Sequence, residues 1–280
     1  MKRERRLGRI TPGLAVVVSF LGQIAAAQKT EEFTYKVAPK AVVSITNNYG
    51  PIAVKPSRNR QVVVTVVSHS DAVSFHNEQH GNRIEIRSRS MTPATGLAEY
   101  TVLVPTDSWV ALHSLEGTLS AEGLNGDLML KAATASVEVS DISDAHIHVK
   151  TLSGPITLTS IRNSYLDVRS VSGNVGLHNG KGSLVEVNSG SGRILYDGDP
   201  GTNGKYLLTS HSGDLDVSIP AKASVEIEAR SLKGELDPGF TSSDTIRATR
   251  QKDLLMQPGI VNASRFVLRS FKGKIHMKRP

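Results

Sequence analysis

Short runs in which apolar and polar residues alternate follow one another along the chain from residue 28 onward. In Tyr165–Arg169 (YLDVR) and Leu184–Asn188 (LVEVN), every second residue is aliphatic. A period of two predicts strands with one buried and one exposed face. No run of useful length follows the helical period after residue 27, so the pattern predicts an all-β protein.

A second segment recurs between these runs, with a serine or threonine three residues before a glycine and an aliphatic residue two places after it. Thr151–Leu158 (TLSGPITL) and Ser170–Leu177 (SVSGNVGL) are examples. The corner glycines are Gly117, Gly154, Gly173, Gly192, Gly213, Gly234 and Gly273, and Ala135 takes the same place in one further copy. Neighbouring copies are 18 to 21 residues apart, except for a step of 39 before Gly273, which predicts that a copy near Leu254 has lost its signature. We expect these glycines at corners that need a positive φ or a close backbone approach.

The repeats predict a stacked architecture, because a pair of short strands cannot bury its apolar face alone. We expect residues 111–280 to form a single-stranded β-helix, or β-solenoid, of 18–21-residue two-strand coils, with Ile156, Val175 and Ile194 in one inward column. Residues 28–110 read as a less periodic N-terminal β region that starts and caps the solenoid, since an open end exposes unpaired strand edges. A propeller is the competing arrangement, but propeller repeats are longer and carry four strands.

The N-terminal segment changes the meaning of the overall charge. The chain of 280 residues has a net charge of +7, which alone would favour a nucleic-acid or anionic partner. Residues 1–27 combine a cationic start, the apolar run Leu14–Leu21 and small residues before Gln28, the pattern of a signal peptide cleaved after Ala27. They hold five basic residues and one acidic residue, so the mature chain carries +3 and the argument for nucleic acid disappears. The apolar run is too short to span a bilayer, so we expect an exported protein of the periplasm or cell surface, with no transmembrane span after cleavage.

The order of these features resembles the bacterial "putative adhesin" family of envelope proteins with a domain of unknown function. The features are the signal peptide, the segment Asn47–Val54 (NNYGPIAV), a strand that ends in Val104-Pro105, and the glycine corners, so the resemblance covers roughly residues 33–278. It implies an exported β-solenoid with a role in adhesion or envelope stress. It carries no catalytic residue over to this chain.

The best candidate for chemistry is a stacked polar column on the outside of three coils. If the aliphatic residues of these strands point inward, His148, Asp167 and Glu186 point outward one above another, flanked by Lys150 and Arg169. Two carboxylates beside a histidine and two cations could bind a sugar acid, a cation or a polysaccharide. The same set could equally be a solvated charge ladder in which the cations offset the carboxylate repulsion.

Other candidate motifs predict neither a metal nor a cofactor nor a catalytic centre. His76 and His80 are four residues apart, but the surroundings resemble a turn rather than the helix of a zinc protease. Asp197–Gly204 (DGDPGTNG) lacks the ligand spacing of an EF-hand and reads as a long corner. The chain has no cysteine, which excludes disulfides and thiol chemistry.

The favoured hypothesis is therefore a non-enzymatic exported β-solenoid that presents a flat repeat face to a cell-envelope component, either a glycan or a protein. One alternative is a carbohydrate-active β-helix enzyme that uses the His148, Asp167 and Glu186 face, although aromatic residues for sugar stacking are few at outward positions. The other is a periplasmic scaffold or envelope-stress accessory protein that partners a membrane protein.

Overall fold

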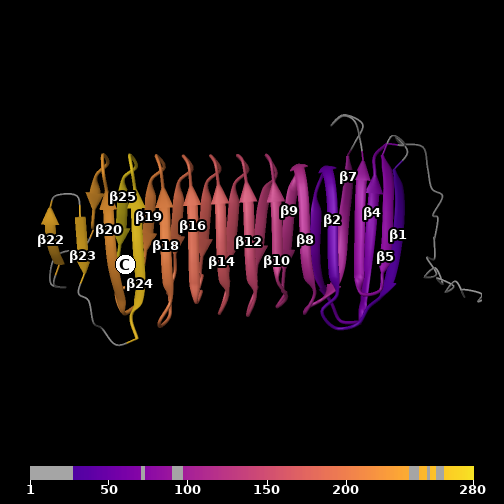
Figure 1. The fold of residues 1–280 in the computed structure, drawn as a ribbon, viewed down its shortest axis with the longest axis horizontal. Coiled ribbons are helices and arrows are strands. Elements are labelled where there is room, and N and C mark those ends of the chain that lie inside the picture. Colours follow the sequence, from indigo (N-terminus) through magenta and orange to yellow (C-terminus); the bar gives the residue numbers. More distant parts are fainter. Residues whose placement is uncertain (1–27, 71–72, 90–96, 240–245, 251–252, 257–261) are drawn as a thin grey trace, which may run out of the picture.

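The chain folds into a β-solenoid in which each coil gives one strand to each of two facing sheets (Figure 1). The computed structural model describes residues 28–70, 73–89, 97–239, 246–250, 253–256 and 262–280. One sheet has 12 strands, in the spatial order β1 (Lys29–Lys36), β4 (Gln61–Ser68), β7 (Ala98–Pro105), β3 (Ile52–Ser57), β9 (Thr118–Glu122), β11 (Ser136–Ser140), β13 (Ile156–Thr159), β15 (Val175–His178), β17 (Ile194–Asp197), β19 (Leu215–Ser218), β25 (Ile275–Lys278) and β21 (Leu236–Asp237). The other sheet has 13 strands, in the order β22 (Ile246–Arg250), β23 (Asp253–Met256), β20 (Val225–Ser231), β24 (Ser264–Ser270), β18 (Lys205–Ser210), β16 (Leu184–Ser189), β14 (Tyr165–Ser170), β12 (His146–Thr151), β10 (Leu128–Ala132), β8 (Trp109–Glu116), β2 (Val42–Tyr49), β6 (Arg83–Arg89) and β5 (Ser74–His80).

Parallel pairing in register places equivalent residues of successive coils beside one another. Ile156 pairs with Val175 and Val175 with Ile194, and all three side chains are buried. The predicted inward column is therefore confirmed. Because the same alternation holds in the facing sheet, aliphatic side chains from both sheets meet in one continuous core along the stack.

The corner motif is explained by one buried hydroxyl and one close approach. The hydroxyl of Ser210 accepts a hydrogen bond from the backbone N–H of Gly213 at 2.9 Å, and Ser270 does the same for Gly273 at 2.8 Å. A Cβ placed on Gly173 would lie 2.1 Å from the carbonyl oxygen of Gly154 in the preceding coil. Close backbone approach, rather than a positive φ, therefore requires glycine at this corner; Gly117, with φ of 119°, sits in the left-handed region as well.

The coil that carries Ala135 replaces both elements of the motif. Ala132 stands in register with Thr151, so the buried hydroxyl is missing from this coil. The N–H of Ala135 donates instead to the carbonyl of Leu115 in the preceding coil, at 3.2 Å. Loss of the hydroxyl and loss of the glycine thus occur together, and the backbone ladder supplies the substitute acceptor.

The end of the stack differs from the prediction of a lost copy near Leu254. The last coil of the chain, β24 and β25, inserts between the β18–β19 coil and the β20–β21 coil (Figure 1). Leu254 lies in β23, which runs antiparallel to β20 at the edge of the 13-stranded sheet and pairs with β22. The long step before Gly273 is therefore an excursion past the end of the stack followed by a return into it, and the prediction of a degenerate coil in series is wrong.

In the N-terminal region, too, the spatial order of the strands differs from their order in the sequence. The first coil, β2 and β3, lies between the β8–β9 coil and the strands β6 and β7. Antiparallel strands then close this end, with β5 beside β6 and with β4 between β7 and β1. The predicted boundary at residue 110 falls inside β8, which pairs directly with β2, so the core runs through that position without a break.

Candidate functional site

The polar column of His148, Asp167 and Glu186 lies on the outer face of the 13-stranded sheet. These residues belong to β12, β14 and β16, where His148 pairs with Asp167 and Asp167 with Glu186. The same register aligns Lys150 with Arg169 in a second row. The neighbouring aliphatic residues of these strands are buried in the core. The structure thus brings all five predicted residues together on one surface; a binding role for them remains a prediction.

Asp167 is the most enclosed member of the column, with its side chain only 8% exposed. Its Oδ1 accepts a hydrogen bond from Arg169 Nε at 3.1 Å, and its Oδ2 lies 3.3 Å from His148 Nδ1. This hydrogen bond, together with the negative charge of Asp167, raises the pKa of Arg169 above its ordinary value. Asp167 therefore anchors the two more exposed side chains, since His148 is 41% and Arg169 57% exposed.

Aromatic rings from the first residues of β12 and β14 border the column. The ring of Tyr165 meets His146 edge to face with centroids 5.8 Å apart, and it meets His148 in the same way at 5.9 Å. Such T-shaped contacts fix ring orientation. The surface thus combines donors on His148 and Arg169, which Asp167 orients, and the exposed Lys150 with a small aromatic rim, a combination suited to a polar or anionic ring-containing ligand.

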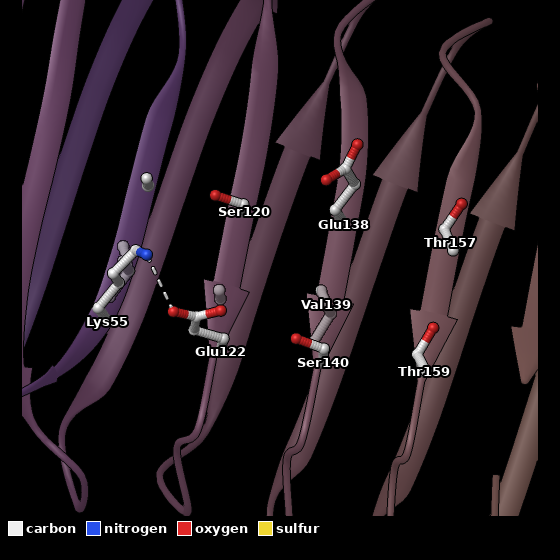
Figure 2. Close-up of a pocket in the computed structure, with 11 residues that line it drawn as sticks. Lys55, Ser120, Glu122, Glu138, Val139, Ser140, Thr157 and Thr159 are labelled. Carbon is white, nitrogen blue, oxygen red and sulfur yellow. Dashed lines mark ion pairs between the residues drawn. The ribbon is translucent and has the colours of Figure 1, made fainter. Parts of the chain in front are cut away.

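A groove on the outer face of the 12-stranded sheet was not predicted from the sequence. It has a volume of about 450 Å³ and crosses β3, β9, β11 and β13. Figure 2 shows Lys55 and Glu122 joined across neighbouring strands, with Nζ 3.2 Å from Oε1; Ser140 lies next to Glu122 on the following strand, and Glu138 lies next to Ser120. Its other polar lining residues are Ser120, Ser140, Thr157 and Thr159. The outward positions of the second strand in each of these coils are Ser, Thr or Glu, and this run of small polar and acidic residues is the sequence signal of the groove.

The other motifs have structural explanations. His76 and His80 lie on β5 rather than on the predicted turn, because residues 74–80 pair with β6, and both rings contact Glu78, at 2.8 and 2.9 Å. These contacts lower the pKa of Glu78. In the long corner after β17, the N–H of Gly201 donates to Asp199 at 3.0 Å. Within the described residues, no group of three or more His, Asp or Glu side chains is arranged to hold a metal ion.

Comparison with known proteins gives a family, whereas the solved structures that match carry no argument. Two solved structures cover 91% of this chain and 100% of their own: a putative cell adhesion protein from Clostridium sporogenes ATCC 15579, at 11% identity and a TM-score of 0.25, and a putative adhesin from Bacteroides fragilis NCTC 9343, at 12% identity and 0.46. At these values neither likeness bears on function. No curated protein matches the chain.

No helix in the described ranges is long and apolar enough to cross a membrane. The family model described as Toastrack DUF4097 matches residues 42–254, well over half of the sequence; β1 and the last coil, β24 and β25, lie outside the matched range. The chain belongs to the Toastrack DUF4097 family.

Proposed function

We propose that the protein is exported and acts as a non-enzymatic, adhesin-like binding module that holds an acidic glycan of the cell envelope on the outer face of its 13-stranded sheet. The observation that carries the proposal is the anchoring of Arg169 and His148 by the enclosed Asp167. Export rests on the signal-peptide pattern of residues 1–27, which lie outside the described residues.

The donors of this surface are held ready for an anion. Arg169 uses Nε for Asp167, so the donors on its terminal nitrogens remain for a ligand, and Lys150 stands exposed beside it in the same row. A guanidinium held in place loses little side-chain freedom when it binds a carboxylate, which strengthens binding. A sugar acid offers that carboxylate together with a ring that the Tyr165 and His146 edge can contact.

The hydrogen bonds of Asp167 favour binding without catalysis. Both of its oxygens already have partners inside the surface, one from Arg169 and one from His148. A general acid or base must instead reach the substrate atom whose proton it moves. The carboxylate is thus better suited to hold its neighbours than to exchange protons with a sugar.

Calorimetric titration of residues 28–280 with polygalacturonate, and with neutral dextran as the comparison polymer, tests the proposal. We expect binding to polygalacturonate only, and a roughly tenfold loss of affinity for Arg169→Ala, about the contribution of one charge-assisted hydrogen bond. Arg193→Ala is the matched control, because Arg193 pairs with Asp216 on the opposite sheet and is 60% exposed. Equal affinity of Arg169→Ala and wild type would refute the proposed site, and shortening of the polymer that Asp167→Asn abolishes would assign an enzyme.

A further inference from the structure

Apolar side chains project from one edge of the solenoid. The second residue of each corner motif lies at the tip of a turn, and we call the apolar residues at this place the apolar ridge: Leu115, Leu152, Val171, Phe271 and Leu232. Leu152 and Val171 are 58% and 59% exposed. In the described part of the chain, the exposed large apolar side chains all lie along this edge: four belong to the ridge, and the fifth is Leu97, beside the Gly50 corner. Phe271 is half-buried.

Backbone hydrogen bonds join the tips of neighbouring coils into one row along the stack (Figure 1). The N–H of Ser172 donates to the carbonyl of Leu152, and the N–H of Lys233 to the carbonyl of Phe271 in the inserted last coil. Eight coils follow one another in this ladder, in the order of the residues Leu115, Ala133, Leu152, Val171, Gly190, His211, Phe271 and Leu232. At a strand spacing of about 4.8 Å, the ridge is about 34 Å long.

The fold itself does not require apolar residues at these tips. Gly190 and His211 occupy equivalent places in the same ladder, so the turn accepts a residue without a side chain or with a polar one. At the opposite edge of the solenoid the apolar residues turn inward, and Ile142 and Ile161 are buried. The tips of that edge are polar residues with positive φ, such as Asp144 and Asn163. Exposure of the ridge is therefore a property of this edge alone, and exposed apolar patches commonly mark interaction surfaces.

Cations accompany the ridge in two stretches, one on β10, β12 and β14 and one on β24 and β20, separated by neutral residues on β16 and β18. The outward residue two places before each tip forms one register row on the 13-stranded sheet: His113, Lys131, Lys150, Arg169, Asn188, Thr209, Arg269 and Arg230. Lys233 and Lys272 add charge at the tips themselves, with Lys233 5.0 Å from the ring centroid of Phe271. Within the row Arg169 pairs with Asp167 and Arg269 with Glu228, and on the side of the 12-stranded sheet Arg193 pairs with Asp216 and Lys274 with Glu235.

We propose that this edge docks on an anionic lipid surface, with the apolar ridge inserted between headgroups and the flanking cations paired with lipid phosphates. A row of separate apolar tips matches a plane rather than a compact ligand, and cations beside inserted apolar residues are the combination by which peripheral proteins hold anionic bilayers. The inference does not rest on the glycan proposal, since the ridge residues lie outside the polar column; the flanking cations Lys150 and Arg169 belong to both surfaces.

Sedimentation of residues 28–280 with vesicles tests the docking. We expect binding to vesicles of phosphatidylcholine with 30% phosphatidylglycerol, weak binding to pure phosphatidylcholine, and a decline as sodium chloride is raised. Leu152→Ser with Val171→Ser should lower the partition coefficient at least tenfold, and Lys233→Glu with Lys272→Glu should lower it by a similar factor, because each cation near an anionic surface contributes about fivefold. Exposed tips of this kind can be exchanged without loss of the core.

Leu195→Ser is the matched apolar control, because Leu195 is half-buried on the outer face of the 12-stranded sheet, away from the ridge. The proposal is overturned if wild type and the Leu152→Ser, Val171→Ser variant partition alike, or if neutral and anionic vesicles bind equally. A dimer in solution that this variant abolishes, without vesicle binding, would assign the ridge to a second copy of the chain. Retained polygalacturonate binding in the variant separates this result from the glycan proposal.

Discussion

Replacement of Gly173 by alanine tests the explanation of the corner motif. The added Cβ would lie 2.1 Å from the carbonyl oxygen of Gly154, whereas real Cβ contacts are essentially never closer than 3.0 Å. The two coils must therefore separate by roughly 1 Å at this corner, about a fifth of the normal strand spacing of about 4.8 Å. Forced insertion of a methyl group into a packed site costs about 1–3 kcal/mol.

Hydrogen bonds at the same corner add to this cost. The Ser170 hydroxyl donates to the carbonyl of Gly173 at 2.8 Å, and the N–H of Ser172 donates to Leu152 of the preceding coil at 2.8 Å. Weakening them removes about 1 kcal/mol, so we expect Gly173→Ala to lower the free energy of unfolding by about 2–4 kcal/mol. For a chain of this size, the melting temperature should fall by roughly 5–15 °C.

Thermal and urea unfolding followed by circular dichroism measures the effect, with Gly180→Ala as the control. A Cβ at Gly180 meets no atom within 4 Å, and its φ is not positive. We expect the unfolding midpoint of this variant to equal that of wild type or to lie slightly higher, because alanine reduces the conformational freedom of the unfolded chain. If both variants unfold at the same midpoint, close approach is not the reason for glycine at the corner.

Three further predictions concern the core, the ionisable groups and the chain end. Phe266→Ala should lower the free energy of unfolding by about 3–5 kcal/mol in urea titration, because the buried ring stacks on Tyr206 at 4.3 Å; a loss below 1 kcal/mol would contradict the packing. Burial raises the pKa of Tyr35 and of Tyr100 to about 12, above the value of about 10 in an unfolded chain, so their contribution to stability is complete below about pH 10 and is lost as the pH rises through about 12. Melting temperatures combined with absorbance at 295 nm across this range check the effect, and tyrosines that all ionise near pH 10 in the folded protein would refute it. Removal of residues 262–280 should make residues 219–239 sensitive to protease, because β20 and β21 lose their parallel partners β24 and β25; unchanged protection would show that the β20–β21 coil stacks without them.

The local architecture could be predicted because its cause is local. A period of two fixes which residues of each strand point inward, and a repeat of 19 residues fixes which residues of successive coils align. This was enough to place Ile156 beside Val175, and His148 beside Asp167. The burial of Asp167 could not be predicted in the same way, because it depends on the rotamers of Arg169 and His148 that fold over it.

The order of the coils at the chain ends was beyond the pattern for a different reason. Every coil presents the same ladder of backbone groups and the same aliphatic row. The motif around Gly273 therefore fits against Gly213 as well as the motif around Gly234, the next one in the sequence, would. Sequence order alone favours stacking in series. The antiparallel hairpin of β22 and β23 instead takes the outer edge of the 13-stranded sheet, and the last coil fills the place beside β18, where both of its sides are paired.

The two proposed surfaces follow from this division between a fixed interior and a free exterior. Inward and corner positions are set by packing, so the outward rows and the corner tips are the places where side chains can change without altering the fold. The polar column lies on the outer face of the 13-stranded sheet, and the apolar ridge runs along the corners where the strands of that sheet end. Lys150 and Arg169 belong to both surfaces, so the Leu152→Ser, Val171→Ser variant should weaken lipid binding alone, whereas Arg169→Ala should weaken the binding of both lipid and glycan.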